Sequence, residues 1–330
     1  FYCILLLISF VGILWSLSFA PHEMSDAAWC ALIPLLIACA YETPVRAARL
    51  GWWCGMVFWL TSIWWLTKVT VAGWLILCAY CSLYIMPVAM FASWWLRRYS
   101  AGRFTANAAF MILLSVLWVA TEYLRMNLFT GFPWNPLGAT QYANLSFIQH
   151  ASWGGVYPIG ALLVWCNAAI AVTILRYLNR HTRFGRKPHP ELMLAMAVLV
   201  VAFLTGGHLL RQIRTDGAEL RIALVQPSIP QDDKWTEETA SLIYERLRNL
   251  TTSAVTWTRP DLVVWPETAL PEDLLYSETG YQLVDELARL GAPLLVGSMD
   301  TEYLDGRRPR FFNTSFLIGT NAMVLERYDK

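Results

Sequence analysis

The chain has 330 residues, of which 56% are hydrophobic and only 15% are charged, and its formal net charge is +1. With 17 tryptophans and a mean hydropathy of +0.42, it exceeds the apolar content of an ordinary globular domain, which excludes a simple soluble protein. We therefore predict an integral membrane protein.

Residues 1–210 contain apolar stretches close to the roughly 20 residues that a helix needs to cross about 30 Å of hydrocarbon. We predict a transmembrane helical bundle of about seven spans near 1–20, 27–41, 51–67, 71–96, 106–121, 154–175 and 191–210. The second span is short and contains Pro34, which predicts a tilted, kinked or partly inserted segment. The first span lacks a basic amino-terminal region and a small-residue cleavage site, so we predict a retained helix.

Basic residues are distributed unevenly among the predicted loops. The loops after the second, fourth and sixth spans carry Arg46, Arg49, Arg97, Arg98, Arg103, Arg176, Arg180, Arg183, Arg186 and Lys187, whereas the alternate loops carry only Lys68 and Arg125. Positive charge marks the cytoplasmic side of membrane proteins, so residues after 210 are predicted on the opposite side, the periplasm of a bacterium. A topology signal accounts for the basic loop after the sixth span better than anionic-lipid or nucleic-acid contact. No nucleic-acid partner is expected.

Residues 211–330 change to the patterning of a soluble domain. Apolar runs predict strands at 220–226, 261–266, 293–299, 311–319 and 322–328, and amphipathic stretches predict helices at 236–255 and 279–291. The first of these strands is expected to be buried. Alternation of strands and helices indicates an α/β domain with a largely parallel sheet, in which reactive groups gather at the carboxyl ends of strands.

Glu267 directly follows the predicted strand 261–266. A solvated loop carboxylate is the ordinary alternative for a glutamate at such a place. However, Pro266 fixes its own backbone and restricts Trp265 to extended geometry, and the bulk of Trp265 would shield the carboxylate from water. Our hypothesis is that this partial desolvation makes Glu267 a better general base.

The motif DLVVWPETALP, residues 261–271, resembles the first catalytic motif of the nitrilase (carbon–nitrogen hydrolase) superfamily. Behind a multi-span bundle, it resembles in particular the bacterial apolipoprotein N-acyltransferase family. Three further segments share this resemblance: WVATEYLRMNLFTGFPWNPLG at 118–138, LVQPSIPQDDKW at 224–235, and FFNTSFLIG at 311–319 with ERYDK at 326–330. The resemblance implies a nitrilase-like α-β-β-α sandwich after the bundle, with domains at 1–210 and 211–330.

The same resemblance implies covalent catalysis by a Glu, Lys and Cys triad. A cysteine thiolate would take an acyl chain from a membrane phospholipid and pass it to the α-amine of a diacylglyceryl-cysteine apolipoprotein. Glu267 would be the base, and Lys330 would stabilise the oxyanion. The expected location is the bacterial inner membrane with a periplasmic catalytic domain, and no cofactor is expected.

Lipid substrates would reach such a site from the bilayer. By resemblance, the side chains expected to shape the entrance are Trp235 and the loop residues Phe132, Pro133, Trp134 and Asn135. An aromatic anchor at the membrane interface is the alternative for the loop. Glu122 and Arg125 stand one helical turn apart and are interpreted either as a structural charge pair or as a contact for a phospholipid head group.

The cysteines depart from the family pattern. All seven lie in predicted spans, at Cys3, Cys30, Cys39, Cys54, Cys78, Cys81 and Cys166, so none follows residue 210. We therefore expect a fragment truncated at its carboxyl terminus, with the nucleophile beyond Lys330. Cys78 and Cys81 have zinc-like spacing but lie inside a span without partner ligands, so small packing residues are expected there and no metal site.

Two other classes of function stay open. A membrane-tethered nitrilase-type amidase would turn over a small water-soluble amide without lipid. A non-catalytic membrane remnant would carry Glu267 without a reaction. A transporter is less favoured, because the spans contain few ionisable residues.

Overall fold

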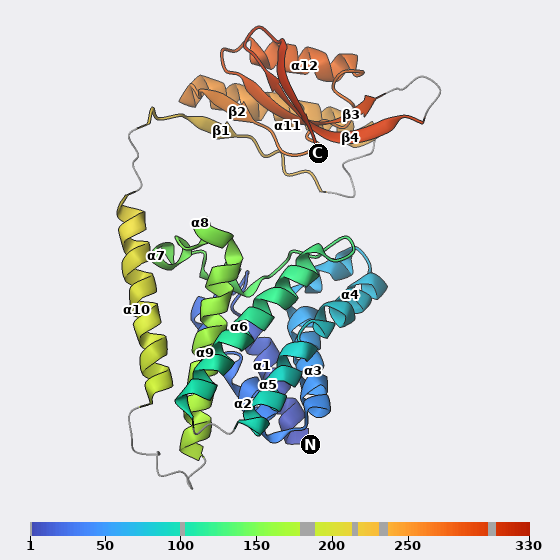
Figure 1. Cartoon of the computed structure of the whole chain (residues 1–330). Coiled ribbons are helices and arrows are strands. Elements are labelled where there is room, and N and C mark those ends of the chain that lie inside the picture. The colour runs from blue at the N-terminus through green and yellow to red at the C-terminus, as the bar shows by residue number, and fades with distance from the viewer. Residues whose placement is uncertain (1, 100–102, 179–188, 213–216, 231–236, 303–307) are drawn as a thin grey trace. The chain divides into compact units, whose positions relative to one another are not determined.

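The computed structural model describes residues 2–99, 103–178, 189–212, 217–230, 237–302 and 308–330. The chain divides into two compact units, Phe1–Arg214 and Thr215–Lys330. Among the described residues the first unit is helical, and the second contains a five-stranded sheet with two helices (Figure 1).

The helical unit contains ten α-helices over the described residues, several of them short. They are α1 (Tyr2–Ser16), α2 (Ile33–Tyr41), α3 (Pro44–Ser62), α4 (Val71–Leu83), α5 (Met86–Arg98), α6 (Phe104–Asn127), α7 (Leu145–Ile148), α8 (Ala151–Gly154), α9 (Val156–Leu178) and α10 (Pro190–Arg211). The 3₁₀ turns η1 (Ser25–Trp29), η2 (Trp64–Lys68) and η3 (Leu137–Gln141) lie between them.

Four helical stretches of the described residues are long and apolar enough to cross a membrane. They are Val71–Arg98, Phe104–Asn127, Val156–Leu178 and Pro190–Arg211, while the helices at Cys3–Ser16 and Ser25–Tyr41 are apolar but shorter. The predicted span 51–67 overlaps α3, whose first turns carry Arg46 and Arg49. The helical unit therefore has the character of a membrane-spanning bundle, with fewer long helices than the seven spans expected.

Prolines interrupt two of the predicted spans. The segment 27–41 is divided into η1 and α2, and Pro34 lies in the first turn of α2. Asn167 of α9 supports this break, because its side chain donates to the carbonyl of Ala28 at 2.9 Å and accepts from the amide of Leu32 at 3.0 Å. The segment 71–96 breaks between α4 and α5, where Pro87 supplies no backbone N–H to continue the first helix.

The core of the helical unit is aromatic. Trp15 stacks on Phe58 with ring centroids 3.8 Å apart, and Trp118 approaches Trp15 at 5.4 Å. α3 packs against α1, α4 and α5, and α9 packs against α6 and α10. α10 keeps an apolar face open, with Met193, Val201 and Leu204 all more than half exposed, which suits contact with lipid chains.

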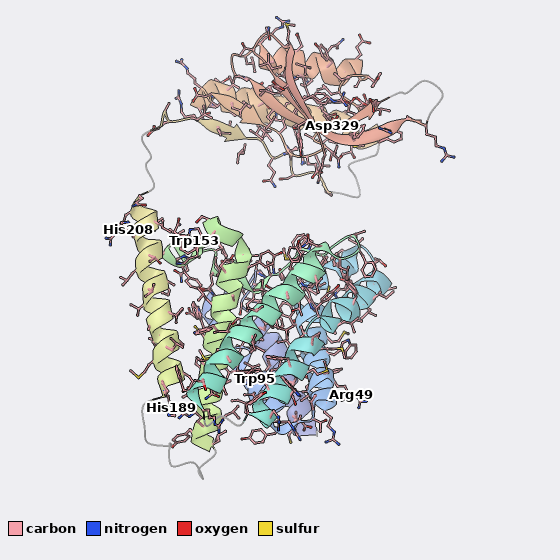
Figure 2. All side chains as sticks on the ribbon, viewed as in Figure 1. Arg49, Trp95, Trp153, His189, His208 and Asp329 are labelled. Atoms are coloured by element: carbon pink, nitrogen blue, oxygen red, sulfur yellow. The ribbon has the colours of Figure 1, made fainter. Side chains whose placement is uncertain are left out.

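One end of the helical unit carries arginines of α3 and α9. Figure 2 shows Arg49, Trp95 and His189 at one end and Trp153 and His208 at the other. Arg176 of α9 is buried near the first end, where it contacts both carboxylate oxygens of Glu191 at 2.7 and 2.6 Å. Since α10 begins directly after His189 and runs past His208, the chain leaves the helical unit at the end opposite these arginines.

The α/β unit contains one mixed sheet. Its elements are β1 (Ile222–Leu224), α11 (Glu237–Thr258), β2 (Leu262–Val264), α12 (Glu278–Ala288), β3 (Leu294–Glu302), β4 (Arg310–Ile318) and β5 (Val324–Asp329). The strand order is β1-β2-β3-β4-β5; the first three strands are parallel, and β4 and β5 are antiparallel to their neighbours. The prediction of these elements is confirmed, but the sheet is less parallel than expected. Gly319–Met323 closes a tight β4–β5 turn, and a short turn joins only antiparallel strands.

Helices cover one face of the sheet (Figure 1). The core joins α11 and α12 to alternate strand residues such as Val263, Val296 and Phe316. Because successive strand residues point to opposite faces, the residues between them lie on the other face. The prediction of a buried first strand is wrong for Ile222 and Leu224, which are 49% and 78% exposed, since β1 is an edge strand with one uncovered face.

Candidate functional site

Glu267 lies in the turn that follows β2. The chain on either side of it is fixed to β3, because Trp265 donates its amide to Leu295 at 2.9 Å and Ala269 donates to Gly297 at 2.8 Å. Thr268 adopts a left-handed backbone with φ of 47°, which non-glycine residues seldom do. The turn therefore holds Glu267 in a defined place at the carboxyl end of the strand, as the sequence indicated.

Gly297 of β3 lies against this turn. A Cβ atom at Gly297 would come within 2.2 Å of the carbonyl oxygen of Pro266 and 2.9 Å of the Cα of Glu267. No side chain fits at such distances without moving the backbone. The close approach of β3 to the Glu267 turn therefore depends on glycine at this position.

Lys330 and Asn313 both contact the Glu267 carboxylate. Lys330 Nζ lies 3.2 Å from Oε1 of Glu267, and the Asn313 side-chain amide donates to the same oxygen at 3.2 Å. The amide of Lys330 in turn donates to the carbonyl of Asn313 at 2.9 Å. Antiparallel pairing of β4 with β5 thus brings the ammonium and the amide donor to one carboxylate.

Asn313 is a site residue that the sequence analysis missed. It lies in the segment FFNTSFLIG, where it is a polar residue just after two phenylalanines in a strand. A polar side chain in an otherwise apolar strand suggests that it has a hydrogen-bond partner. The identity of the partner depends on strand pairing, which the local pattern does not reveal.

A cavity of about 290 Å³ adjoins these three side chains. The cavity is lined by Trp265, Glu267, Leu295, Gly297, Asn313, Thr314, Ser315, Tyr328 and Lys330. The Glu267 and Lys330 side chains are 60% and 73% exposed, so solvent reaches both.

Trp265 does not shield Glu267 from water as expected. Its side chain is buried in the core between the sheet and α11, and its indole N–H donates to Thr251 Oγ1 at 3.0 Å. Alternation along the strand turns Trp265 to the helix-covered face, while Glu267 faces the cavity. The hypothesis of desolvation by Trp265 is therefore not supported by the structure.

An ionic network fixes the strand that leads to Lys330. Arg327 of β5 reaches across β4 to the buried Asp300 of β3 at 2.7 Å, and it also bonds Asp329 at 2.9 Å. The hydrogen bond from Arg327 holds the pKa of Asp329 below its ordinary value, and Thr314 donates to the same carboxylate at 2.8 Å. Three strands are thus joined immediately beside the site.

The loop between α6 and η3 carries the predicted lipid-access residues. Trp134 is half exposed, and its ring lies 5.2 Å from that of Trp65. Phe132 packs edge-on against Trp59 at 5.8 Å. A cavity of about 510 Å³ is lined in part by Trp134 and Asn135.

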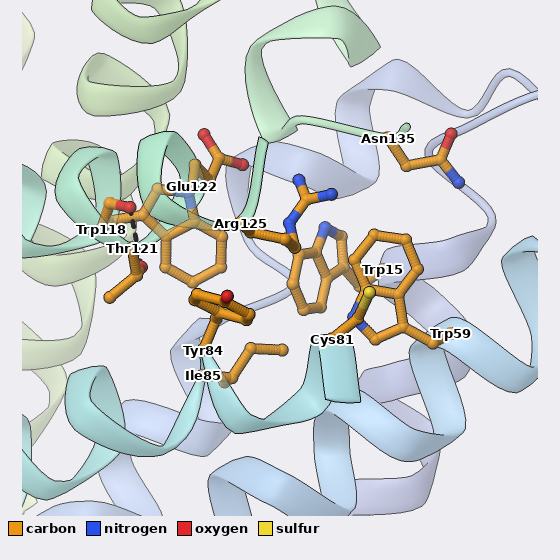
Figure 3. Close-up of a pocket in the computed structure, with 10 residues that line it drawn as sticks. All are labelled: Trp15, Trp59, Cys81, Tyr84, Ile85, Trp118, Thr121, Glu122, Arg125 and Asn135. Carbon is orange, nitrogen blue, oxygen red and sulfur yellow. Dashed lines mark hydrogen bonds between the residues drawn. The ribbon is translucent and has the colours of Figure 1, made fainter. Parts of the chain in front are cut away.

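Glu122 and Arg125 are buried at 6% and 3% exposure, and both contact this loop. Figure 3 shows them on one helix, near Trp59 and the segment that carries Asn135. The structure therefore groups the pair with the loop in the helical unit, and Glu267 with Lys330 in the α/β unit. Trp235, the remaining predicted binding residue, lies outside the described residues.

None of the seven cysteines belongs to the α/β unit. Cys39, Cys54, Cys78, Cys81 and Cys166 are buried in the helical unit, and Cys3 and Cys30 are exposed there. Within the described part of the chain, no group of three or more His, Cys, Asp or Glu side chains could hold a metal ion.

The chain has an apolar helical unit, followed by a mixed α/β unit that carries a carboxylate–ammonium pair. These features define a multi-pass membrane protein with an α/β domain. Residues 11–169 match the family model described as the apolipoprotein N-acyltransferase N-terminal domain. The chain is also 33% identical, over 97% of its length, to the apolipoprotein N-acyltransferase of Geobacter metallireducens. The resemblance seen in the motifs is thereby confirmed: over nearly its whole length the chain is similar to proteins named apolipoprotein N-acyltransferase.

Other proteins named apolipoprotein N-acyltransferase are also similar to this chain. The protein of Azotobacter vinelandii is 31% identical over 94% of this chain, and that of Brucella suis is 29% identical over 86%. The chain spans 61% of the Geobacter protein, 60% of the Azotobacter protein and 53% of the Brucella protein. It therefore covers somewhat more than half of the length of these relatives.

Proposed function

We propose that this protein transfers an acyl chain from a membrane phospholipid to the amino-terminal amine of diacylglyceryl-cysteine apolipoproteins. The observation that carries the proposal is the 3.2 Å contact of Glu267 with Lys330 beside a cavity, in a chain related to apolipoprotein N-acyltransferases. A carboxylate and an ammonium placed this closely can serve as base and oxyanion partner for acyl transfer.

The proposed reaction has two steps. In the first, Glu267 takes the thiol proton of a cysteine, and the thiolate attacks the carbonyl carbon of the phospholipid ester. The acyl carbon–oxygen bond breaks, and the lysophospholipid leaves as an alcohol that takes the proton back from Glu267. In the second, the acceptor amine loses a proton to Glu267 and attacks the thioester, the carbon–sulfur bond breaks, and an amide forms while the thiol is restored. Lys330 would stabilise the oxyanion of each tetrahedral intermediate.

The cysteine of this scheme is not among residues 1–330, because all seven cysteines belong to the helical unit. The proposal assigns it to sequence beyond Lys330, which the greater length of the relatives allows. The α/β unit would then be the first part of a nitrilase-like sandwich. Its sheet face opposite α11 and α12 carries Leu295 and Asn313 of the cavity lining, and a second layer would pack on this face.

We further propose an inner-membrane location with the α/β unit on the periplasmic face. The arginines at one end of the helical unit support this orientation, because positive charge favours the cytoplasmic side. α10 ends at the opposite end, where the chain continues toward the α/β unit. Trp134 and the 510 Å³ cavity would receive the lipid, and Trp235 would contribute to the entrance.

The intact mass of the protein purified from its native membranes tests this proposal. Treatment with hydroxylamine cleaves thioesters, so the expected result is a loss of mass equal to one acyl chain. A Glu267→Gln variant should acquire no such adduct, whereas Glu286→Gln, at an exposed position paired with Arg248, should keep it. A parent protein without any hydroxylamine-sensitive adduct would instead favour an amidase or a non-catalytic protein.

A further inference from the structure

The loop after α6 has an unusual backbone. Phe129 and Asn135 adopt left-handed conformations with φ of 59° and 50°, and Gly131 between them has φ of 71°. Left-handed backbone is unfavourable for a residue with a side chain, and it persists only where the surroundings fix it. Such a loop therefore requires firm anchors.

Arg125 provides the first anchor. Its Nη1 donates to the carbonyl of Phe132 at 2.6 Å and to that of Trp134 at 2.8 Å. The guanidinium lies 4.8 Å from the ring centroid of Trp59, against which Phe132 also packs. The positive charge of Arg125 is thus directed at loop carbonyls and an aromatic face.

Glu122 provides the second anchor, one helical turn earlier on α6. Its Oε1 accepts the amide of Leu137 at 2.7 Å, at the far end of the loop. Each charge thus meets backbone groups of the opposite polarity, carbonyls for the cation and an amide for the anion. Because both side chains are nearly fully buried, neither is available to a lipid head group at the surface.

We propose that Arg125 and Glu122 are positioning residues that clamp this loop, so that Trp134 and Asn135 form a fixed wall of the 510 Å³ cavity. Trp64, Trp65 and His22 line the same cavity. The clamp acts on the backbone on both sides of Trp134 and at Leu137, and it does not touch substrate. The idea that this wall helps to bind lipid rests on the proposed function. The clamp of the loop by Arg125 and Glu122 does not rest on it.

Hydrogen–deuterium exchange of the full-length protein in lipid nanodiscs tests the clamp. Arg125→Lys keeps the charge, but the lysine ammonium ends one bond short of the position of Nη1, which donates to both carbonyls, and lysine lacks the planar guanidinium that lies over Trp59. We expect amides of residues 128–137 to exchange roughly tenfold faster in this variant. The matched control is Arg176→Lys, which alters a buried arginine paired with Glu191 and should leave the loop unchanged. Unchanged exchange of the loop in Arg125→Lys would overturn the proposal.

Two variants at Glu122 decide the question if Arg125→Lys does not fold. Glu122→Gln keeps an oxygen acceptor for the Leu137 amide, whereas Glu122→Leu removes it. Faster exchange at Leu137 is expected in Glu122→Leu only. Equal exchange in the two variants would argue against the clamp.

The kinetic readout separates positioning from direct lipid contact. A displaced wall should raise the KM for phospholipid in Arg125→Lys by about tenfold and change kcat less. A raised KM without any change in loop exchange would mean that Arg125 binds lipid itself, which contradicts the proposal. If the parent has no acyltransferase activity, the proposed function fails, while the exchange result still decides the clamp.

Discussion

Lys330 Nζ lies 3.2 Å from Oε1 of Glu267, although 63 positions separate the two residues in the chain. The contact exists because the turn after β2 and the end of β5 meet on the same face of the sheet. Asn313 bonds both partners, through its side chain to Glu267 and through its carbonyl to Lys330. The arrangement fits a base whose proton transfers are coupled to a fixed positive charge.

On the proposed function, Glu267→Gln in the full-length protein should abolish most acyl transfer and leave the fold intact. The amide keeps an oxygen for Lys330 and Asn313 but cannot take a proton, and loss of a general base lowers rates by about 10²–10⁴-fold. Turnover of a phospholipid with a diacylglyceryl peptide is the measurement, with Glu286→Gln as the control. Activity within threefold of the parent, a margin of about 0.65 kcal/mol, would remove Glu267 from the mechanism.

Substitution Gly297→Ala should displace the turn that carries Glu267. The added methyl group would meet the carbonyl of Pro266, and we expect a loss of about 2 kcal/mol in stability together with reduced turnover. Gly217→Ala is the matched control, because nothing lies within 4 Å of a Cβ there. If both variants behave like the parent in hydrogen exchange and activity, the turn is not held as tightly as the structure indicates.

Substitution Arg327→Gln should destabilise the β3–β5 region. The substitution leaves the buried Asp300 carboxylate without its cation, while Arg327 itself is partly exposed. Removing one partner of such a pair lowers the free energy of unfolding by about 2 kcal/mol. Native-state hydrogen exchange of β4 and β5 measures the loss. Arg289→Gln breaks an exposed pair with Asp285 and should have no measurable effect. Equal exchange in the two variants would show that Asp300 does not depend on Arg327.

Asp273 gives the α/β unit a specific dependence on pH. Burial raises the pKa of its carboxyl, and the neighbouring Asp300 adds to this effect. The folded state therefore holds the proton more tightly than the unfolded chain, whose pKa is about 3.9, and stability falls as pH rises through the interval between the two values. Asp273→Asn should thus melt a few degrees higher than the parent at neutral pH and lose this advantage below about pH 4.

Asp285→Asn is the control of opposite sign. Arg289 lowers the pKa of Asp285, so that carboxylate adds stability above its unfolded pKa, and the contribution is lost as pH falls through the folded pKa. Its removal should lower the melting temperature at neutral pH or leave it unchanged. A higher melting temperature for both variants would indicate a general effect of net charge.

Much of the fold follows from local sequence signals. Ser277 caps α12 by accepting the amide of Gly280, and Gly291 with φ of 108° follows its end, so both boundaries could be predicted. Pro34 likewise indicated a broken second span. The break before Pro87 was missed, because a long apolar window outweighs one proline when hydropathy is averaged along the chain.

The site could be predicted only in part. Glu267 and Lys330 were named from motifs, but Asn313 was missed because its partner is set by the register of β4 against β3 and β5. For Arg125, the sequence left a lipid contact and a structural role equally open. The burial of Arg125 and its hydrogen bonds to two carbonyls depend on how the loop folds back over α6. The spacing of Glu122 and Arg125 on one helix does not reveal the path of that loop.

The tight turn between β4 and β5 also bears on the order in which the molecule folds. A hairpin closes within about 1–10 μs, so Asn313 and Lys330 can meet early through local contacts. Glu267 joins them only after β2 and β3 have paired in parallel. This step is slower, because the long connection that contains α12 must close first. We expect the contact between Glu267 and Lys330 to be among the last to form, so the site around Glu267 stays incomplete until the slowest strands of the α/β unit have paired.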